Sequence, residues 1–86
     1  MKKLLEFLVT SIVKYPDQVV ITESQEGDMF NLRLDVHKED IRMVIGRNGK
    51  TIRAIRNILR LKAIKEGTRI NLTLVTPEEK TAPSTN

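Results

Sequence analysis

Apolar residues recur at helical spacing in the first part of the chain. In residues 3–14 they come in adjacent pairs every four positions, which places them on one broad face of a helix. Tyr15-Pro16 should end this helix, because the residue before a proline is pushed out of the helical region. Residues 18–26 then predict a strand, and Gly27-Asp28 supplies a turn.

The next strand is predicted by strict alternation. In residues 29–36 every second position is apolar and the positions between are polar, as expected for a sheet with one face in solvent. Helical spacing returns in residues 38–45, with two acidic residues in the first turn, where the helix dipole favours them. Residues 50–65 predict a longer helix that Gly67 stops, and residues 68–75 predict a last strand.

This order of elements predicts an α+β fold. The first two strands are close enough in sequence to form an antiparallel hairpin. The two helices between the last two strands make a crossover that is long enough for parallel pairing, and such a crossover is right-handed. We expect a three-stranded mixed sheet with three helices on one face. Residues 1–76 should form a single domain, and residues 77–86, which are polar and contain proline, a flexible C-terminal tail.

Length and composition exclude several classes of protein. The 86 residues are enough for one small core and too few for an enzyme with a large closed cleft. The chain has no cysteine, which excludes disulfides and thiolate metal sites. No segment has the roughly 20 apolar residues of a transmembrane helix, and Glu6 interrupts the only stretch that resembles a secretory signal. We therefore expect a cytoplasmic protein.

Positive charge is concentrated in the middle of the chain. Residues 38–65 hold nine Lys or Arg against two acids, a balance of +7, whereas the rest of the chain has six against nine, a balance of −3. A solvated helix face accounts for any one of these cations. The whole cluster is better explained as a surface on which a polyanion docks.

Two glycines lie within this basic stretch, in the run Val44-Ile45-Gly46-Arg47-Asn48-Gly49-Lys50-Thr51-Ile52. Gly46 can leave the preceding helix at positive φ, and Gly49 lets a ligand approach the start of the next helix, where backbone N–H groups and the dipole favour anions. Arg47 and Lys50 add positive charge. The simpler alternative is a tight turn between helices, which needs at most one glycine.

This run resembles the signature of the KH domain, an apolar pair followed by Gly-x-x-Gly and an isoleucine, and the whole chain to residue 76 is similar to the type II form of that family. The resemblance implies a loop that clamps about four nucleotides of single-stranded RNA. The chain is also similar to small single-KH proteins of bacteria, which act as RNA chaperones or regulators. Together, the resemblance and the basic cluster assign the following residues to RNA binding: Gly46, Arg47, Asn48, Gly49, Lys50, Arg42, Ile45, Val44, Ile41 and Arg53, with Ile52 in support.

Two other motifs suggest different chemistry. Gly49-Lys50-Thr51 matches the end of a nucleotide-binding P-loop, but the first glycine of that motif would fall at Val44. His37 is the only histidine and has acidic neighbours, yet one histidine with scattered carboxylates is typical of a solvated strand end. We therefore expect no enzyme activity, no cofactor and no metal. The near absence of aromatic residues argues against base-stacking platforms and predicts modest affinity and limited sequence preference.

The long helix has more apolar residues than one core face needs. At 100° per residue, Ala54, Ile58 and Leu61 fall away from the predicted core. They are either incidental surface residues or a partner interface, for a homodimer or for another protein. The resemblance adds pairing with a larger KH-containing protein. Two functions therefore remain open: direct binding of RNA, or an interaction module whose partner recognises the RNA.

Overall fold

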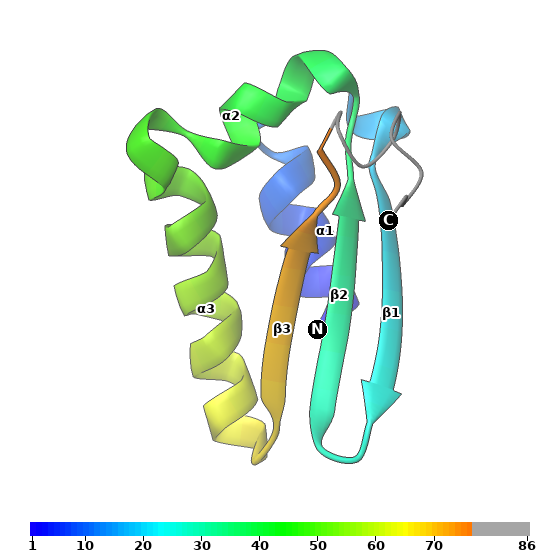
Figure 1. Cartoon of the computed structure of the whole chain (residues 1–86), viewed down its shortest axis with the longest axis vertical. Coiled ribbons are helices and arrows are strands. Elements are labelled where there is room, and N and C mark those ends of the chain that lie inside the picture. Colours follow the sequence, from blue (N-terminus) through cyan, green and yellow to red (C-terminus); the bar gives the residue numbers. More distant parts are fainter. Residues whose placement is uncertain (77–86) are drawn as a thin grey trace, which may run out of the picture.

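The computed structural model describes residues 1–76 as one three-stranded sheet with helices packed against it (Figure 1). The predicted tail, residues 77–86, lies outside the described residues. The predicted order of helices and strands is confirmed, with the following bounds: α1 Lys2–Thr10, β1 Val20–Glu26, β2 Met29–Asp35, α2 Ile41–Ile45, α3 Lys50–Glu66 and β3 Arg69–Leu74. Three short 3₁₀ turns connect them, at Pro16–Gln18, Lys38–Asp40 and Arg47–Gly49.

The mixed sheet has the predicted connections. β2 lies in the centre, pairing antiparallel with β1 and parallel with β3. Ile21 in β1, Leu34 in β2 and Leu74 in β3 share one row of this register, and Leu32 pairs with Leu72 in another. The apolar side of the alternation therefore falls on a single face of the sheet.

The helices cover that face. α1 lies behind the sheet in Figure 1, α3 runs alongside β3, and α2 crosses at the end where β2 finishes. The core consists of apolar side chains from all six elements, and its fully buried members include Leu5 and Val9 of α1, Leu32 and Leu34 of β2, and Leu59 of α3. No helix of residues 1–76 covers the opposite face of the sheet. None of the helices in the described part of the chain is long and apolar enough to cross a membrane.

The first helix is shorter than the sequence predicts. It ends at Thr10 and not at Lys14, and at this end the hydroxyls of Thr10 and Ser11 donate back to the carbonyls of Glu6 and Phe7, at 2.7 and 2.6 Å. Side chains that bond to the backbone in this way compete with the helical pattern. The proline signal after Tyr15 therefore lies several residues beyond the actual end of the helix.

A buried carboxylate then redirects the chain. Asp40 is only 3% exposed, and its two oxygens accept hydrogen bonds from the backbone N–H groups of Lys14 and Tyr15, both at 2.9 Å. Asp40 was predicted to lie in the first turn of a helix, where the helix dipole favours an acid. Its carboxylate instead links the segment after α1 to the segment before α2. This contact fixes the end of the fold at which α2 and the glycine loop begin.

Candidate nucleic-acid interface

The loop between α2 and α3 is built from unusual backbone conformations. α2 ends where the N–H of Gly46 donates to the carbonyl of Arg42 at 2.8 Å, and Gly46 then takes φ 76° and ψ 172°. Asn48 and Gly49 both adopt left-handed conformations, with φ 56° and 75°. α3 begins at Lys50, so the loop leads directly into the N-terminal turn of a 17-residue helix. The predicted positive φ at Gly46 is confirmed.

The two glycines are needed for different reasons. A Cβ atom on Gly46 would overlap Oγ1 of Thr51 and lie 2.8 Å from its backbone N, so the loop packs directly on the first turn of α3. A Cβ on Gly49 would meet only the end of the Arg53 side chain, at 3.1 Å. Gly46 is therefore essential to the packing of the turn, and Gly49 lies next to a guanidinium group on the outer surface of the loop.

Positive charge surrounds this loop without nearby compensation. Arg42, Arg47, Lys50 and Arg53 are all exposed. Within residues 1–76, no carboxylate forms an ion pair with any of the four, and the pairs that are found involve Lys62 with Glu66 and Arg69 with Asp28. A shallow hollow at the loop is lined by Arg42, Ile45, Gly46 and Arg47. The arrangement offers an anion both backbone and side-chain donors.

The apolar residues assigned to this site divide into two groups. Val44 has no exposed surface, and Ile41 and Ile52 are 7% and 8% exposed, so these three side chains pack in the core. Ile45 is only partly buried and lines the hollow. Of the apolar residues, Ile45 is thus the one whose side chain a base could touch, while the others hold α2 and α3 in place beneath the loop.

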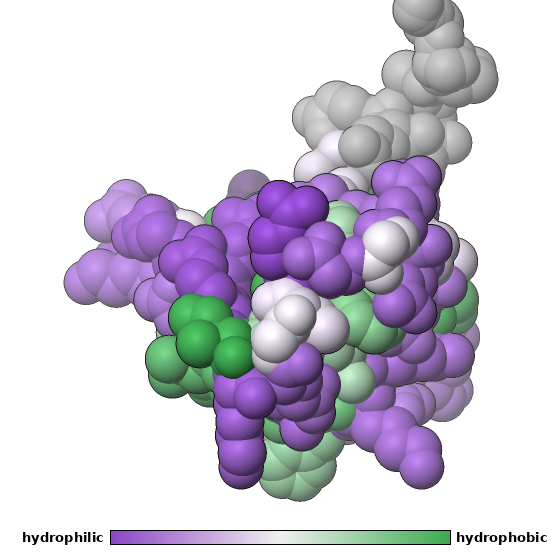
Figure 2. All heavy atoms as spheres, turned by 90° about the horizontal axis from the view of Figure 1, so that it is seen from below, coloured by the Kyte–Doolittle hydropathy of each residue, from purple (hydrophilic) through white to green (hydrophobic). Residues whose placement is uncertain are grey.

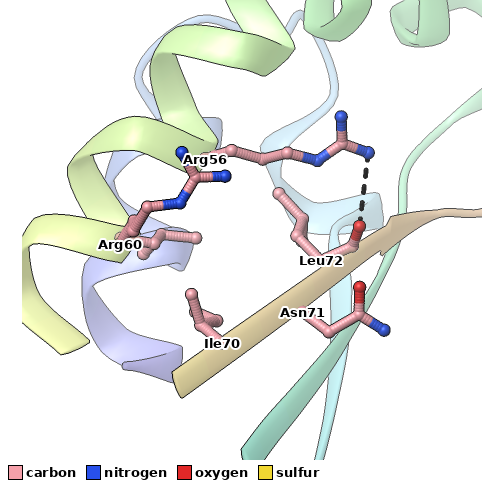
Figure 3. Close-up of a pocket in the computed structure, with 6 residues that line it drawn as sticks. Arg56, Arg60, Ile70, Asn71 and Leu72 are labelled. Carbon is pink, nitrogen blue, oxygen red and sulfur yellow. Dashed lines mark hydrogen bonds between the residues drawn. The ribbon is translucent and has the colours of Figure 1, made fainter. Parts of the chain in front are cut away.

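A second hollow continues along α3, between this helix and β3 (Figure 3). It has a volume of about 90 Å³ and is lined by Arg56, Leu59, Arg60, Ile70, Asn71 and Leu72. The Arg56 guanidinium reaches across it, and Nη2 donates to the carbonyl of Leu72 at 3.3 Å. The sequence places Arg56 and Arg60 within the basic stretch of residues 38–65 but does not indicate the β3 side of the groove, because alternation does not reveal which strand forms the sheet edge.

The partly apolar outer face of α3 is where the sequence places it. Ala54 is exposed, and Ile58 and Leu61 are 42% and 68% exposed. Ile64, which was not predicted as part of this face, is 67% exposed and lies 60° from Leu61 at helical spacing. Figure 2 shows apolar side chains gathered at the left, the side on which Figure 1 places α3.

The two competing motifs have other roles in the fold. The segment before Gly49-Lys50-Thr51 is a helix, whereas a P-loop follows a strand. His37 stacks on Tyr15 with ring centroids 4.1 Å apart, and its Nδ1 accepts a hydrogen bond from the N–H of Glu39 at 3.0 Å. Residues 1–76 contain no group of three or more His, Cys, Asp or Glu side chains placed to hold a metal.

Comparison with known proteins agrees with this architecture. The family model for the KH domain of KhpA and KhpB matches residues 2–74. The RNA-binding protein KhpA of Halalkalibacterium halodurans is 33% identical over 75 residues, which cover 87% of this chain and 99% of that protein. KhpA of Clostridium acetobutylicum is 36% identical over 75 residues, covering 87% and 100%. KhpA of Oceanobacillus iheyensis is 41% identical over 59 residues, covering 69% and 79%.

Solved structures of larger proteins contain the same fold. A crystal structure of Aquifex aeolicus Era bound to GDP and AlF4⁻ superposes with a TM-score of 0.62 at 14% identity, covering 93% of this chain and 32% of Era. Era in complex with MgGDPNP and nucleotides 1506–1542 of 16S ribosomal RNA gives a TM-score of 0.53 with the same identity and coverage. At this identity the likeness concerns the fold, and it spans about a third of each larger chain.

Proposed function

Because this chain belongs to the KhpA/KhpB family of KH domains, we propose that it binds single-stranded RNA as an RNA chaperone or post-transcriptional regulator. Its relatives of similar length are named RNA-binding proteins, and the chain is long enough to cover them almost completely. The proposed role is binding, in the cytoplasm, without a catalysed reaction.

The observation that carries this proposal is the Gly46–Gly49 loop with its cations, which form no ion pair with a carboxylate of residues 1–76. Phosphate oxygens are acceptors only, and here they would meet the positive end of α3, Arg47, Lys50 and the Arg53 guanidinium beside Gly49. Gly49 carries no side chain on the outer surface of the loop, so the backbone of the RNA can approach the backbone of the protein closely there. The loop would therefore fix the position of the strand without reading its sequence.

The bases of the same strand would then lie toward Ile45 and the groove between α3 and β3. Arginines line both hollows: Arg42 and Arg47 line the one at the loop, and Arg56 and Arg60 line the one along α3. Aromatic side chains line neither hollow, so the bases would contact aliphatic surface and hydrogen-bonding groups in place of stacking platforms.

A salt titration of RNA binding tests the loop assignment. We expect the affinity for a single-stranded RNA to fall as salt rises, and to fall strongly in the double variant Arg47→Asp with Asn48→Asp, which changes the charge by −3. The matched control, Lys3→Asp with Gln25→Glu, makes the same change in charge. Lys3 lines a hollow together with Glu66, the last residue of α3, and the helix at 1.5 Å per residue separates Glu66 from the loop by about 25 Å.

The two variants separate local contact from net charge. If the control loses as much affinity as the loop variant, the RNA responds only to overall charge and the loop has no special part. If the loop variant binds as well as the wild type, the loop assignment is wrong.

A second function is favoured by the exposed face of α3. Ala54, Ile58 and Leu61 follow each other at intervals of four and three residues, the spacing by which two helices pack along a seam. We propose that this seam pairs with the same seam of a second copy. A larger KH-containing protein is the alternative occupant, in which case the partner supplies most of the RNA recognition.

A further inference from the structure

β1 forms the edge of the sheet on the side away from α3 (Figure 1). The N–H of Val75 donates to the carbonyl of Leu34 at 2.8 Å, so the even-numbered residues of β2 direct their backbone groups to β3. The odd-numbered residues of β2 therefore face β1, where each pairs with an even-numbered residue. It follows that the odd-numbered residues of β1 direct their N–H and C=O groups away from the sheet.

The accessible part of this edge is the run Thr22–Glu26, in which every residue is exposed, whereas Ile21 is buried. Within residues 1–76, no other segment hydrogen-bonds to the outward backbone groups of Glu23 and Gln25. β1 has no proline and no lysine, and no bulge interrupts its pairing with β2, so it lacks three of the features that commonly block an edge strand. The backbone of this edge can therefore accept a further strand.

The charged side chains of the edge limit which strand can be added. Glu23 and Glu26 are the only charged residues in the run, and neither forms an ion pair within the described residues. The nearest strand and helix do carry cations, but Arg33 belongs to β2 and Lys3 to α1, outside the row that an added strand would face. Side chains directly opposite each other on paired strands interact, and like charges there are destabilising. A second copy of β1 would bring more acids and no cation, and RNA is itself a polyanion.

We propose that this edge binds an extended basic segment of another protein, which adds to β1 as a fourth strand. Glu23 and Glu26 are three residues apart in the strand, so their side chains lie on opposite faces of the sheet. A segment that pairs with both acids needs two basic residues three positions apart, about 10 Å along the strand, with uncharged residues between them. The proposal does not depend on RNA binding, because the groove beside β3 lies at the other edge of the sheet.

Fluorescence anisotropy of a labelled octapeptide with the full chain tests the proposal. The peptide has two lysines three positions apart, with threonine and valine elsewhere. Glu23→Lys with Glu26→Lys should bind it about tenfold more weakly than the wild type, because two favourable cross-strand pairs become repulsive. The same variant should prefer the matching peptide with glutamates in place of the lysines. The control Glu6→Lys with Glu39→Lys makes the same change in charge at exposed positions outside β1 and should still prefer the lysine peptide.

Two changes in the peptide test how it binds without altering the protein. Methylating its backbone nitrogens removes the hydrogen-bond donors of the added strand and should abolish binding. Moving the lysines to positions two apart places both on one face, so that only one acid can be paired, and should weaken binding about threefold.

The possible results separate a strand added at β1 from attraction by overall charge. The proposal is overturned if the wild type does not bind the lysine peptide, or if the charge-reversed variant binds it as tightly as the wild type. It is also overturned if the control variant loses as much affinity as the charge-reversed one, if the methylated peptide binds equally well, or if the two lysine spacings bind equally.

Discussion

The loop can be tested first through its stability, by replacing Gly46 with alanine. The conformation of Gly46, φ 76° and ψ 172°, belongs to a region that residues other than glycine essentially do not adopt. The new Cβ would also lie 2.6 Å from Cβ and 2.8 Å from the backbone N of Thr51, atoms that cannot move without shifting α3. Gly46→Ala therefore combines backbone strain with overpacking.

The cost can be estimated from these two effects. The backbone strain is worth about 1 to 3 kcal/mol and the overpacking about 1 to 3 kcal/mol, so the free energy of unfolding should fall by about 2 to 6 kcal/mol. A domain of this size is stable by roughly 4 to 13 kcal/mol. Gly46→Ala should thus remove a large part of the stability and unfold a fraction of the protein at the lower end of that range.

Two other glycines provide matched controls. Gly49 and Gly67 are also at positive φ, 75° and 73°, but a Cβ would meet only the end of Arg53 at Gly49 and nothing within 4 Å at Gly67. Each change to alanine should cost only about 1 to 2 kcal/mol, the penalty of a left-handed residue. Urea denaturation followed by circular dichroism measures all three. If Gly46→Ala is no more destabilising than Gly67→Ala, the packing of the loop on Thr51 is not as described.

Three further changes test other parts of the molecule. Asp40→Asn leaves one acceptor for the N–H groups of Lys14 and Tyr15, so it should lower the free energy of unfolding by about 2 to 4 kcal/mol. The control Glu39→Gln, at an exposed position, should change the free energy of unfolding little. Equal effects of the two changes in urea denaturation would refute the role of the buried carboxylate. Val44→Ala removes two methyl groups from a fully buried side chain and should cost about 1 to 3 kcal/mol, with the same measurement as check. Leu61→Asp should convert a dimer to a monomer in sedimentation equilibrium without loss of fold; an unchanged mass, or a wild type that is already monomeric at high concentration, would contradict the α3 seam.

The sequence predicted the fold well because its elements are strongly patterned. The alternation in β2 and the spacing of α3 each place apolar residues on one side, and the two-helix crossover dictates a parallel pair. The positive φ of Gly46 followed from the need to leave α2 sharply. In these places the local sequence and the tertiary structure favour the same conformation.

Contacts between distant residues could not be predicted in this way. The segment after α1 is held by Asp40, which is 26 residues beyond Lys14 and accepts a hydrogen bond from its N–H. The groove at β3 depends on which strand forms the sheet edge and on the direction of one arginine side chain. The apolar residues of the site also could not be divided by pattern, since Val44 and Ile45 are adjacent and only Ile45 reaches the surface hollow.

The most direct test of the central claim is a titration of ¹⁵N-labelled protein with a single-stranded RNA, followed by the backbone amide signals. We expect the largest shifts at residues 46–51 and at Ile70 and Leu72, which border the two hollows, with little change on the outer face of α3 around Leu61. Shifts confined to the face of Ala54, Ile58 and Leu61, or no shifts at RNA concentrations that saturate a close relative, would contradict the assignment of the Gly46–Gly49 loop as the RNA-binding site.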